Sequence, residues 1–212
     1  PDPVALEHDL LVEVKAISVN PVDAKVRAAS GAAQGEWKVL GWDAAGVVRA
    51  IGPAVTHFQL GDRVWYAGDI TRGGTNAVLH LVDERIVGYM PKTLDFAQAA
   101  ALPLTSITAW EMLFDRLGLR PGKNHGGDAL LIIGASGGVG SIMTRLARRM
   151  TDITVIGTAS RPETQAWVRE LGAHHVIDHT HPLSAELKPI GINQLSRIFS
   201  LNKTDEHFAE IV

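Results

Sequence analysis

The sequence contains no cysteine. Disulfide bonds, thiolate catalysis and every zinc site that needs a Cys ligand are therefore excluded. No apolar run approaches the roughly 20 residues that a transmembrane helix requires, and the first residues lack the sections of a signal peptide. We expect a soluble, cytoplasmic protein without a membrane partner.

An excess of charge of one sign is also missing, since the formal net charge is only −3. Nucleic-acid binding needs a concentrated basic face. The short basic run Arg145, Arg148 and Arg149 is more typical of the solvated side of a helix than of a binding patch. We expect no nucleic-acid partner. With 212 residues and 46% hydrophobic content, the chain can bury a substantial core.

The first half of the chain has the pattern of strands separated by turns. Residues rich in β-branched side chains recur at Leu10–Val14, Ala45–Ala50 and Arg63–Tyr66, and turn signals such as Gly52-Pro53 and Gly61-Asp62 lie between them. This pattern predicts a mostly β, antiparallel and barrel-like domain.

The pattern changes after Pro103. Apolar residues at helical spacing predict a helix over Thr105–Leu117, ended by Gly118, and the apolar run Ala129–Ile133 predicts a strand buried on both faces of a parallel sheet. Helices and strands then alternate, as in a doubly wound α/β fold. They are expected over 139–150, 153–158, 162–171, 175–178 and 197–201, and Thr204 is expected to cap a final helix.

The glycine-rich turn Gly134–Gly140 follows the predicted buried strand and precedes a predicted helix. In the G-x-G-x-x-G pattern, Gly137 and Gly140 fill the second and third positions, but Ala135 occupies the first. Glycines let backbone N–H groups approach a pyrophosphate at the positive end of a helix. The strand before the turn and the helix after it favour dinucleotide binding.

The end of the next strand indicates which dinucleotide is bound. NAD recognition usually places an acidic residue there, whereas this chain has Ser160 and Arg161. Arg donates paired, charge-assisted hydrogen bonds to phosphate, which favours the 2′-phosphate of NADPH. In the alternative interpretation, Ser160 caps a helix that starts at Pro162 and Arg161 is solvated; Glu163, the nearest acid, argues against NADPH.

Five motifs in order resemble the medium-chain dehydrogenase/reductase superfamily, in particular its quinone oxidoreductase branch and the zinc-type alcohol dehydrogenase-like proteins. They are Val-Asn-Pro-Val-Asp-Ala-Lys-Val-Arg at 19–27, Gly-Trp-Asp-Ala-Ala-Gly at 41–46, Gly-Asp-Arg-Val at 61–64, Leu-Pro-Leu-Thr-Ser-Ile-Thr-Ala-Trp at 102–110 and the glycine-rich turn at 134–140. The resemblance covers nearly the whole chain.

The resemblance implies a GroES-like catalytic domain over residues 1–103 and a Rossmann dinucleotide-binding domain over residues 104–212. It also implies an active site in the cleft between them and assembly into a homodimer or homotetramer. Relatives are longer, and Pro1 and Val212 both fall close to or inside a predicted element. We therefore expect both domains to be incomplete at their outer ends.

The same resemblance implies roles for individual residues, although it identifies no catalytic residue. Asn20 corresponds to an asparagine near the nicotinamide ribose, and Thr105 to a threonine that touches the cofactor. His179 stands where relatives often have a tyrosine beside the adenosine ribose, and an exposed histidine without that role is an equal alternative. The remaining expected cofactor residues are Ser136, Gly137, Gly138 and Val139 at the pyrophosphate and Ser160 and Arg161 at the 2′-phosphate.

Zinc is not expected. Alcohol-oxidising relatives hold zinc through a Cys, a G-H-E motif and a further Cys or His, but here the motif reads Gly41-Trp42-Asp43. Trp cannot ligate zinc, and His8, His57 and His80 lack ligand spacing.

Without a metal, hydride transfer from NADPH to an electron-poor quinone or α,β-unsaturated carbonyl is easier than oxidation of an unactivated alcohol. The sequence offers no convincing acid/base pair, and we interpret Asp23 and Asp43 as structural. Two alternatives stay open: a zinc-dependent alcohol dehydrogenase, and an NADPH-binding sensor without turnover.

Overall fold

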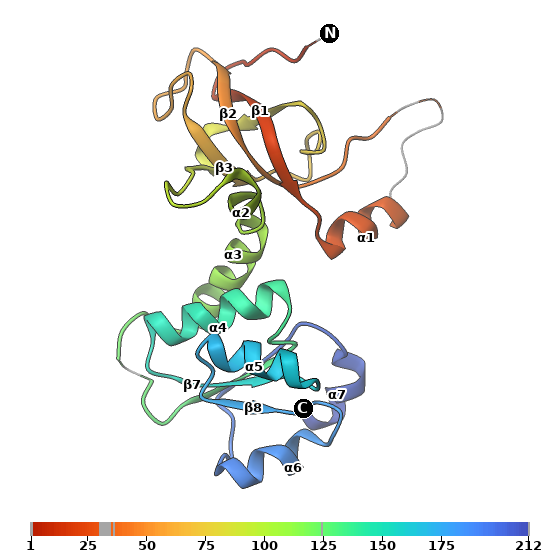
Figure 1. Cartoon of the computed structure of the whole chain (residues 1–212), viewed down its shortest axis with the longest axis vertical. Coiled ribbons are helices and arrows are strands. Elements are labelled where there is room, and N and C mark those ends of the chain that lie inside the picture. Colours follow the sequence, from red (N-terminus) through yellow and green to blue (C-terminus); the bar gives the residue numbers. More distant parts are fainter. Residues whose placement is uncertain (1, 30–34, 36, 124, 212) are drawn as a thin grey trace. The chain divides into compact units, whose positions relative to one another are not determined.

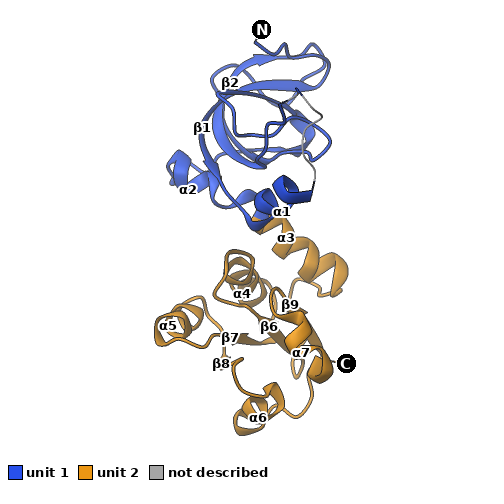
Figure 2. Cartoon of the chain, turned by 90° about the vertical axis from the view of Figure 1, so that its right-hand side faces the viewer, with its two compact units in different colours: residues 1–104 blue, residues 105–212 orange. Residues whose placement is uncertain are grey.

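The computed structural model describes residues 2–29, 35, 37–123 and 125–211 (Figure 1). The chain divides into two compact units, residues 1–104 and residues 105–212 (Figure 2). Each unit has buried apolar clusters of its own. Within the described residues, no helix is long and apolar enough to cross a bilayer.

The first unit is built on an antiparallel sheet with the strand order β4-β1-β2-β3-β5. Its strands are β1 (Asp9–Ser18), β2 (Asp43–Ile51), β3 (Arg63–Ala67), β4 (Leu79–Asp83) and β5 (Val87–Tyr89). The three strands that the sequence pattern predicted are confirmed. Alternate residues such as Leu10 and Val12 face a core that also contains Val48, Val64 and Val82.

Two helices that the sequence pattern did not indicate accompany this sheet. Helix α1 (Pro21–Ala29) follows β1, and the short helix α2 (Phe96–Ala100) buries Ala99 and Ala100 against Ala45 of β2. Asp95 and Gln98 form a capping box at the start of α2.

A buried carboxylate joins three parts of the first unit. Glu84 lies in the 3₁₀ turn η1 (Glu84–Ile86) and is 3% exposed. It accepts hydrogen bonds from the backbone N–H groups of Thr56 (3.0 Å) and His57 (2.9 Å), and its Oε1 lies 2.9 Å from Nδ1 of His8. The His8 contact, followed by the backbone hydrogen bonds, lowers the pKa of Glu84 to about 2.

The second unit is a parallel sheet with helices on both faces, and its strand order is β8-β7-β6-β9. The strands are β6 (Ala129–Ile133), β7 (Thr154–Thr158), β8 (His175–Ile177) and β9 (Arg197–Ser200). Figure 2 shows α4 (Gly138–Met150) and α5 (Pro162–Glu170) on one face, and α6 (Leu183–Leu187) and α7 (Thr204–Ile211) on the other. The chain thus combines a mostly β, antiparallel unit with a parallel α/β unit that has helices on both faces, as the sequence pattern predicted.

Strand β6 is buried on both faces, as its unbroken apolar sequence predicted. Leu130 and Ile132 pack with Met143 and Ala147 of α4, whereas Leu131 and Ile133 pack in a second cluster that includes Leu183 and Leu187 of α6. The strand is therefore the centre of the unit, and the segment that follows it leaves from a rigid position.

The helix predicted over Thr105–Leu117 is present, but its second half is not a regular α-helix. The α-helix α3 spans Pro103–Trp110 and continues as a π-helix, η2 (Glu111–Arg116). The wider turn closes when the N–H of Leu117 reaches the carbonyl oxygen of Met112 at 2.9 Å. Thr204 is also not a cap, because it is the first residue of α7 itself.

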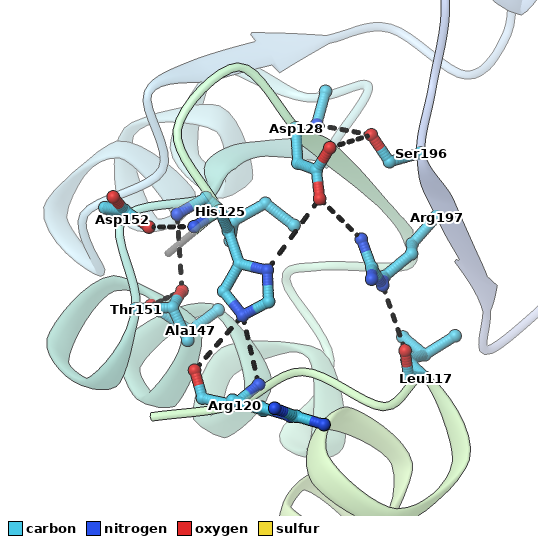
Figure 3. A network of polar contacts seen from close by, with 11 residues as sticks. Leu117, Arg120, His125, Asp128, Ala147, Thr151, Asp152, Ser196 and Arg197 are labelled. Carbon is cyan, nitrogen blue, oxygen red and sulfur yellow. Dashed lines mark hydrogen bonds and ion pairs between the residues drawn. The ribbon is translucent and has the colours of Figure 1, made fainter. Parts of the chain in front are cut away.

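Polar contacts hold the amino ends of β6 and β9 together (Figure 3). Asp128 accepts a hydrogen bond from Ser196 Oγ at 3.0 Å and pairs with Arg197 at 2.9 Å. The Nε of Arg197 in turn donates to the carbonyl oxygen of Leu117 at 2.9 Å. These contacts fix β9 beside β6 and so determine which segments meet at the opposite, carboxyl edge of the sheet.

We predict that Glu84→Gln lowers the stability of the first unit, because an amide cannot accept from three donors as a carboxylate does. The carboxylate stays charged in the fold down to about pH 2 but protonates near pH 4.5 when unfolded, so its contribution is full above about pH 4.5 and is lost as the pH falls toward 2. Thermal unfolding at several pH values measures this.

The difference in melting temperature between wild type and Glu84→Gln should be largest at neutral pH and shrink as the solution is acidified. Glu170→Gln, an exposed position on α5, serves as the control and should leave the melting temperature unchanged. A difference that stays constant down to pH 3 would contradict the assignment.

Candidate functional site

The glycine-rich turn lies at the carboxyl end of β6 and leads into α4. Gly134 adopts a φ of +84°, a conformation that favours glycine, and its N–H donates to Thr158 Oγ1 at 3.0 Å. A Cβ placed on Gly140 would lie 2.4 Å from the carbonyl oxygen of Gly134. The first turn of α4 therefore folds directly against the end of the strand, which is the close packing that a phosphate-binding turn requires.

The amino end of α4 exposes backbone donors. Gly137 occupies the N-cap position, where it offers no side chain to accept from the first N–H groups of the helix, and Gly137 and Gly138 are exposed. The helix is 13 residues long, so the partial positive charge at its start is well developed. These N–H groups are suited to an anion such as a pyrophosphate.

The strand order places this turn at the point where the chain stops adding strands on one side of β6 and adds the next one on the other side. From β6 the chain moves to β7 and β8 on one side, whereas β9 pairs with β6 on the other. In open α/β sheets, ligands bind at the carboxyl edge at such a point. Asn202, which follows β9, lies against the turn, since a Cβ on Gly134 would be 2.8 Å from its Oδ1.

Thr105 lies next to the same turn. A Cβ placed on Gly138 would be 3.2 Å from Thr105 Cγ2, and Thr105 is buried. The structure therefore brings Thr105 together with the predicted pyrophosphate residues, Ser136, Gly137, Gly138 and Val139.

Ser160 and Arg161 follow β7 at the same edge of the sheet. Arg161, not Ser160, occupies the N-cap position of α5, so the alternative in which Ser160 caps this helix is wrong. The Arg161 side chain is 71% exposed and its Nε lies 3.2 Å from Glu163 Oε1. An exposed ion pair of this kind contributes little to stability, and the guanidinium remains accessible to an anionic ligand.

His179 follows β8, the neighbour of β7. The N–H of Ala159 donates to the carbonyl oxygen of Ile177 at 3.0 Å, which keeps the ends of these two strands together. Burial lowers the pKa of His179, and its buried Nδ1 has no hydrogen-bond partner among the described residues. The ring packs edge-on to that of His207 in α7 at 6.3 Å.

Asn20 belongs to the first unit and immediately precedes α1. It is 8% exposed, and its Nδ2 donates to Oδ2 of Asp43 at 2.7 Å. The backbone N–H of Asn20 donates to Oδ2 of Asp23 at 2.7 Å, and the N–H of Asp23 donates back to the carbonyl oxygen of Asn20 at 3.0 Å. Two carboxylates that the sequence suggested only as structural residues thus converge on one predicted cofactor residue.

Asp43 is fully buried at the start of β2. Its Oδ1 accepts from the N–H of Leu104 at 2.8 Å, so both carboxylate oxygens are used as acceptors. Burial raises its pKa, the hydrogen bonds from Asn20 and Leu104 lower it, and the charge of Asp23 raises it further. Sequence reasoning did not identify the contact with Asn20, because no local pattern connects residues so far apart in the chain.

Two histidines of the first unit, His8 and His80, have contacts of their own. The Nδ1 of His8 lies 2.9 Å from Oε1 of Glu84. The Nδ1 of His80 lies 3.0 Å from Oη of Tyr66, and its Nε2 lies 2.9 Å from the carbonyl oxygen of Gly73. Burial lowers the pKa of His80. Within the residues that the structure describes, no group of three His, Cys, Asp or Glu side chains is arranged to bind a metal.

Comparison with known proteins gives concordant matches. Residues 6–106 match the alcohol dehydrogenase GroES-like domain. A zinc-type alcohol dehydrogenase-like protein of Staphylococcus aureus is 44% identical over 212 residues, covering 99% of this chain and 62% of that protein.

Two solved structures match the whole chain or nearly all of it. A protein from Rhizobium etli, provisionally described as a zinc-dependent alcohol dehydrogenase, is 59% identical with a TM-score of 0.92, covering 100% of this chain and 61% of that one. Escherichia coli quinone oxidoreductase, solved with NADPH, is 26% identical with a TM-score of 0.82, covering 99% of this chain and 64% of that one. The chain thus spans less than two thirds of the length of each relative.

We predict that Gly140→Ala destabilises the second unit. The new Cβ would lie 2.4 Å from the carbonyl oxygen of Gly134 and 2.7 Å from Cα of Ala135, and neither backbone atom can move without disturbing the turn. Overpacking of this kind costs roughly 1–3 kcal/mol, which exceeds the gain in helix propensity. Urea unfolding measures the change.

Gly126→Ala is the matched control, because its Cβ would meet only Asp152 Oδ2 at an ordinary 3.7 Å. If both variants unfold at the same urea concentration as wild type, the close approach of Gly140 to Gly134 is not a constraint on this fold.

Proposed function

This chain belongs to the medium-chain dehydrogenase/reductase superfamily, in its quinone oxidoreductase branch, and we propose that it forms part of an NADPH-dependent oxidoreductase. In this proposal, residues 1–103 are the catalytic domain and residues 104–212 the dinucleotide-binding domain. The observation that carries it is the uncapped amino end of α4, which directs free N–H groups to the carboxyl edge of the sheet between β6 and β9. The assembly that we propose is a homodimer or homotetramer, as the family resemblance implies.

The residues of the turn fit a dinucleotide. The backbone N–H groups of Ser136, Gly138 and Val139 would bind the pyrophosphate. The N–H of Gly137, which was also expected there, instead donates to the carbonyl oxygen of Gly134 at 3.1 Å and so closes the turn. The buried Thr105 beside Gly138 would contact the cofactor from α3. Asn20 would bind the ribose next to the nicotinamide. The bound cofactor supplies a hydride, and these residues supply orientation and exclude water.

NADPH is proposed over NADH because of the end of β7. Arg161 presents an exposed guanidinium there, and Ser160 beside it is not used as a helix cap. Glu163 holds Arg161 only through an exposed pair, which a phosphate with its larger charge can replace. His179, at the end of the neighbouring strand, would border the adenosine ribose.

The proposed acceptor is a quinone or an α,β-unsaturated carbonyl, reduced without metal. Trp42 lines a small pocket of the first unit, whose other lining residues include the apolar Val39 and Ile70 and the charged Lys38, Asp69 and Arg72. Where relatives place a zinc-binding histidine, the indole of Trp42 offers no metal ligand, which favours an electron-poor acceptor that needs no Lewis acid. Oxidation of an unactivated alcohol would need a group to stabilise the developing alkoxide, and the chain has no cysteine to hold zinc.

We predict that Arg161→Ala weakens NADPH binding about 10- to 100-fold, the range of a lost charge-assisted phosphate contact. NADH has no 2′-phosphate, so its affinity should change by less than about 2-fold. Fluorescence titration of both cofactors measures this. Arg169→Ala, also exposed but at the far end of α5, is the control. Equal losses for NADPH and NADH would remove the phosphate assignment.

We also predict that the intact protein oxidises NADPH when a quinone or an enone is added, and that treatment with a zinc chelator leaves this rate unchanged. Loss of the near-ultraviolet absorbance of NADPH reports the reaction, and atomic absorption reports the metal. Stoichiometric zinc with chelator-sensitive alcohol oxidation would establish the zinc alcohol dehydrogenase alternative. Tight NADPH binding without oxidation by any acceptor would establish the sensor.

A further inference from the structure

We propose that Asp43 is a positioning residue that determines which end of the Asn20 side-chain amide, the oxygen or the nitrogen, faces the cofactor. By holding the amide nitrogen of Asn20, it turns the amide oxygen outward as an acceptor for a hydroxyl group of the cofactor's nicotinamide ribose. This inference rests on the proposed function, and it assigns to Asp43 a role in recognition in place of a purely structural one.

Asp43 is itself held rigidly. It is the first residue of β2 and pairs with Ser18 of β1 on one side and Ala67 of β3 on the other. Its carbonyl oxygen accepts from Thr75 Oγ1 at 3.2 Å, and its Oδ1 accepts from the N–H of Leu104. With its main chain inside the sheet and one oxygen already engaged, the carboxylate presents Oδ2 to Asn20 in a fixed direction.

The carboxylate determines which way the amide of Asn20 faces. Its Nδ2 lies 2.7 Å from Oδ2 of Asp43. In the opposite orientation, two oxygen atoms would meet at that distance in a buried site, where repulsion is weakly screened and a lost hydrogen bond is costly. The amide oxygen therefore points away from Asp43, and the group that it can recognise is a hydrogen-bond donor.

The start of α1 leaves the side chain of Asn20 available for this contact. An asparagine at a helix start usually accepts from an N–H group of the first turn through its side chain. Here the N–H of Asp23 donates to the backbone oxygen of Asn20, while the side chain of Asp23 takes the N–H of Asn20. The main chain of Asn20 is thus fixed by Asp23, and its amide group by Asp43.

Two buried carboxylates next to one asparagine are an unfavourable arrangement for stability alone. Asp23 is 7% exposed and its Oδ1 has no hydrogen-bond partner among the described residues, while Asp43 is 0% exposed. Each charge raises the cost of the other in a poorly solvated site. Neutralising Asp43 should relieve this repulsion, so a variant there is expected to fold.

The substitution Asp43→Asn changes which hydrogen bonds the side chain at position 43 can make, while its size and packing stay nearly the same. The new amide has one acceptor oxygen, which the N–H of Leu104 uses, so its NH₂ group faces Asn20. Asn20 must turn over to accept from it, and it then presents NH₂ outward where an oxygen had been. The exchange Asn20→Asp with Asp43→Asn restores an outward oxygen, because the new carboxylate at position 20 accepts from position 43 with one oxygen and presents the other.

The test compares NADPH with 2′,5′-ADP, which carries the phosphorylated adenosine half but lacks the nicotinamide ribose. Calorimetric titration of the intact protein should give an NADPH affinity about 10- to 100-fold weaker in Asp43→Asn, with 2′,5′-ADP within about 2-fold of wild type. The double exchange should recover most of the NADPH affinity. Asp62→Asn, which alters a carboxylate that accepts the N–H of Gln59 in a surface turn, is the control.

Unchanged NADPH affinity in Asp43→Asn would overturn the inference, and so would equal losses for NADPH and 2′,5′-ADP. If wild type binds neither ligand, the proposed function fails and this inference fails with it. Melting temperatures check folding. If Asp43→Asn does not fold, the double exchange is compared with Asn20→Asp alone, and the account requires the double exchange to bind NADPH at least about 10-fold more tightly.

Discussion

The fold of the second unit depends on a close approach of two backbone segments, the end of β6 and the first turn of α4. Gly134 and Gly140 are the residues that permit it, because a side-chain atom on Gly140 would strike the carbonyl oxygen of Gly134. The buried strand Ala129–Ile133 fixes one segment, and the packing of Met143 and Ala147 against it fixes the other. Backbone N–H groups are thereby held in place without a side chain to satisfy them, which is a local cost that an anionic ligand can offset.

The proposed cofactor contacts surround this turn in a way that follows from the sheet. Parallel strands all end at one edge, so the residues after β6, β7 and β8 lie in sequence along it. Arg161 and His179 belong to this edge, although they are far from the turn in sequence. In the first unit, two carboxylates hold Asn20 in place. Asp23 accepts a hydrogen bond from its backbone N–H, and Asp43 accepts one from its side-chain amide. Rigid positioning of polar groups is what hydride transfer demands of a protein whose cofactor supplies the chemistry.

Much of this architecture could be predicted from the sequence where one local signal dominates. The wholly apolar run 129–133 and the helical face of α4 specified a buried strand and an amphipathic helix, and both are confirmed. The π-helix Glu111–Arg116 could not be predicted, because apolar spacing does not separate a wide turn from a regular one. The contact between Asn20 and Asp43, and that between His179 and His207, depend on long-range packing that no local pattern encodes. The N-cap of α5 is Arg161 and not Ser160. The sequence could not predict this, because the start of a helix can shift by one residue without any change in its apolar spacing.

The central claim is that free N–H groups between β6 and α4 bind the pyrophosphate of a nicotinamide dinucleotide. A crystal structure of the intact protein soaked with NADPH tests it most directly. We expect pyrophosphate density within hydrogen-bond distance of the backbone nitrogens of Ser136, Gly138 and Val139, with the 2′-phosphate beside Arg161. Well-ordered NADPH bound elsewhere, or an empty turn at saturating NADPH, would contradict it.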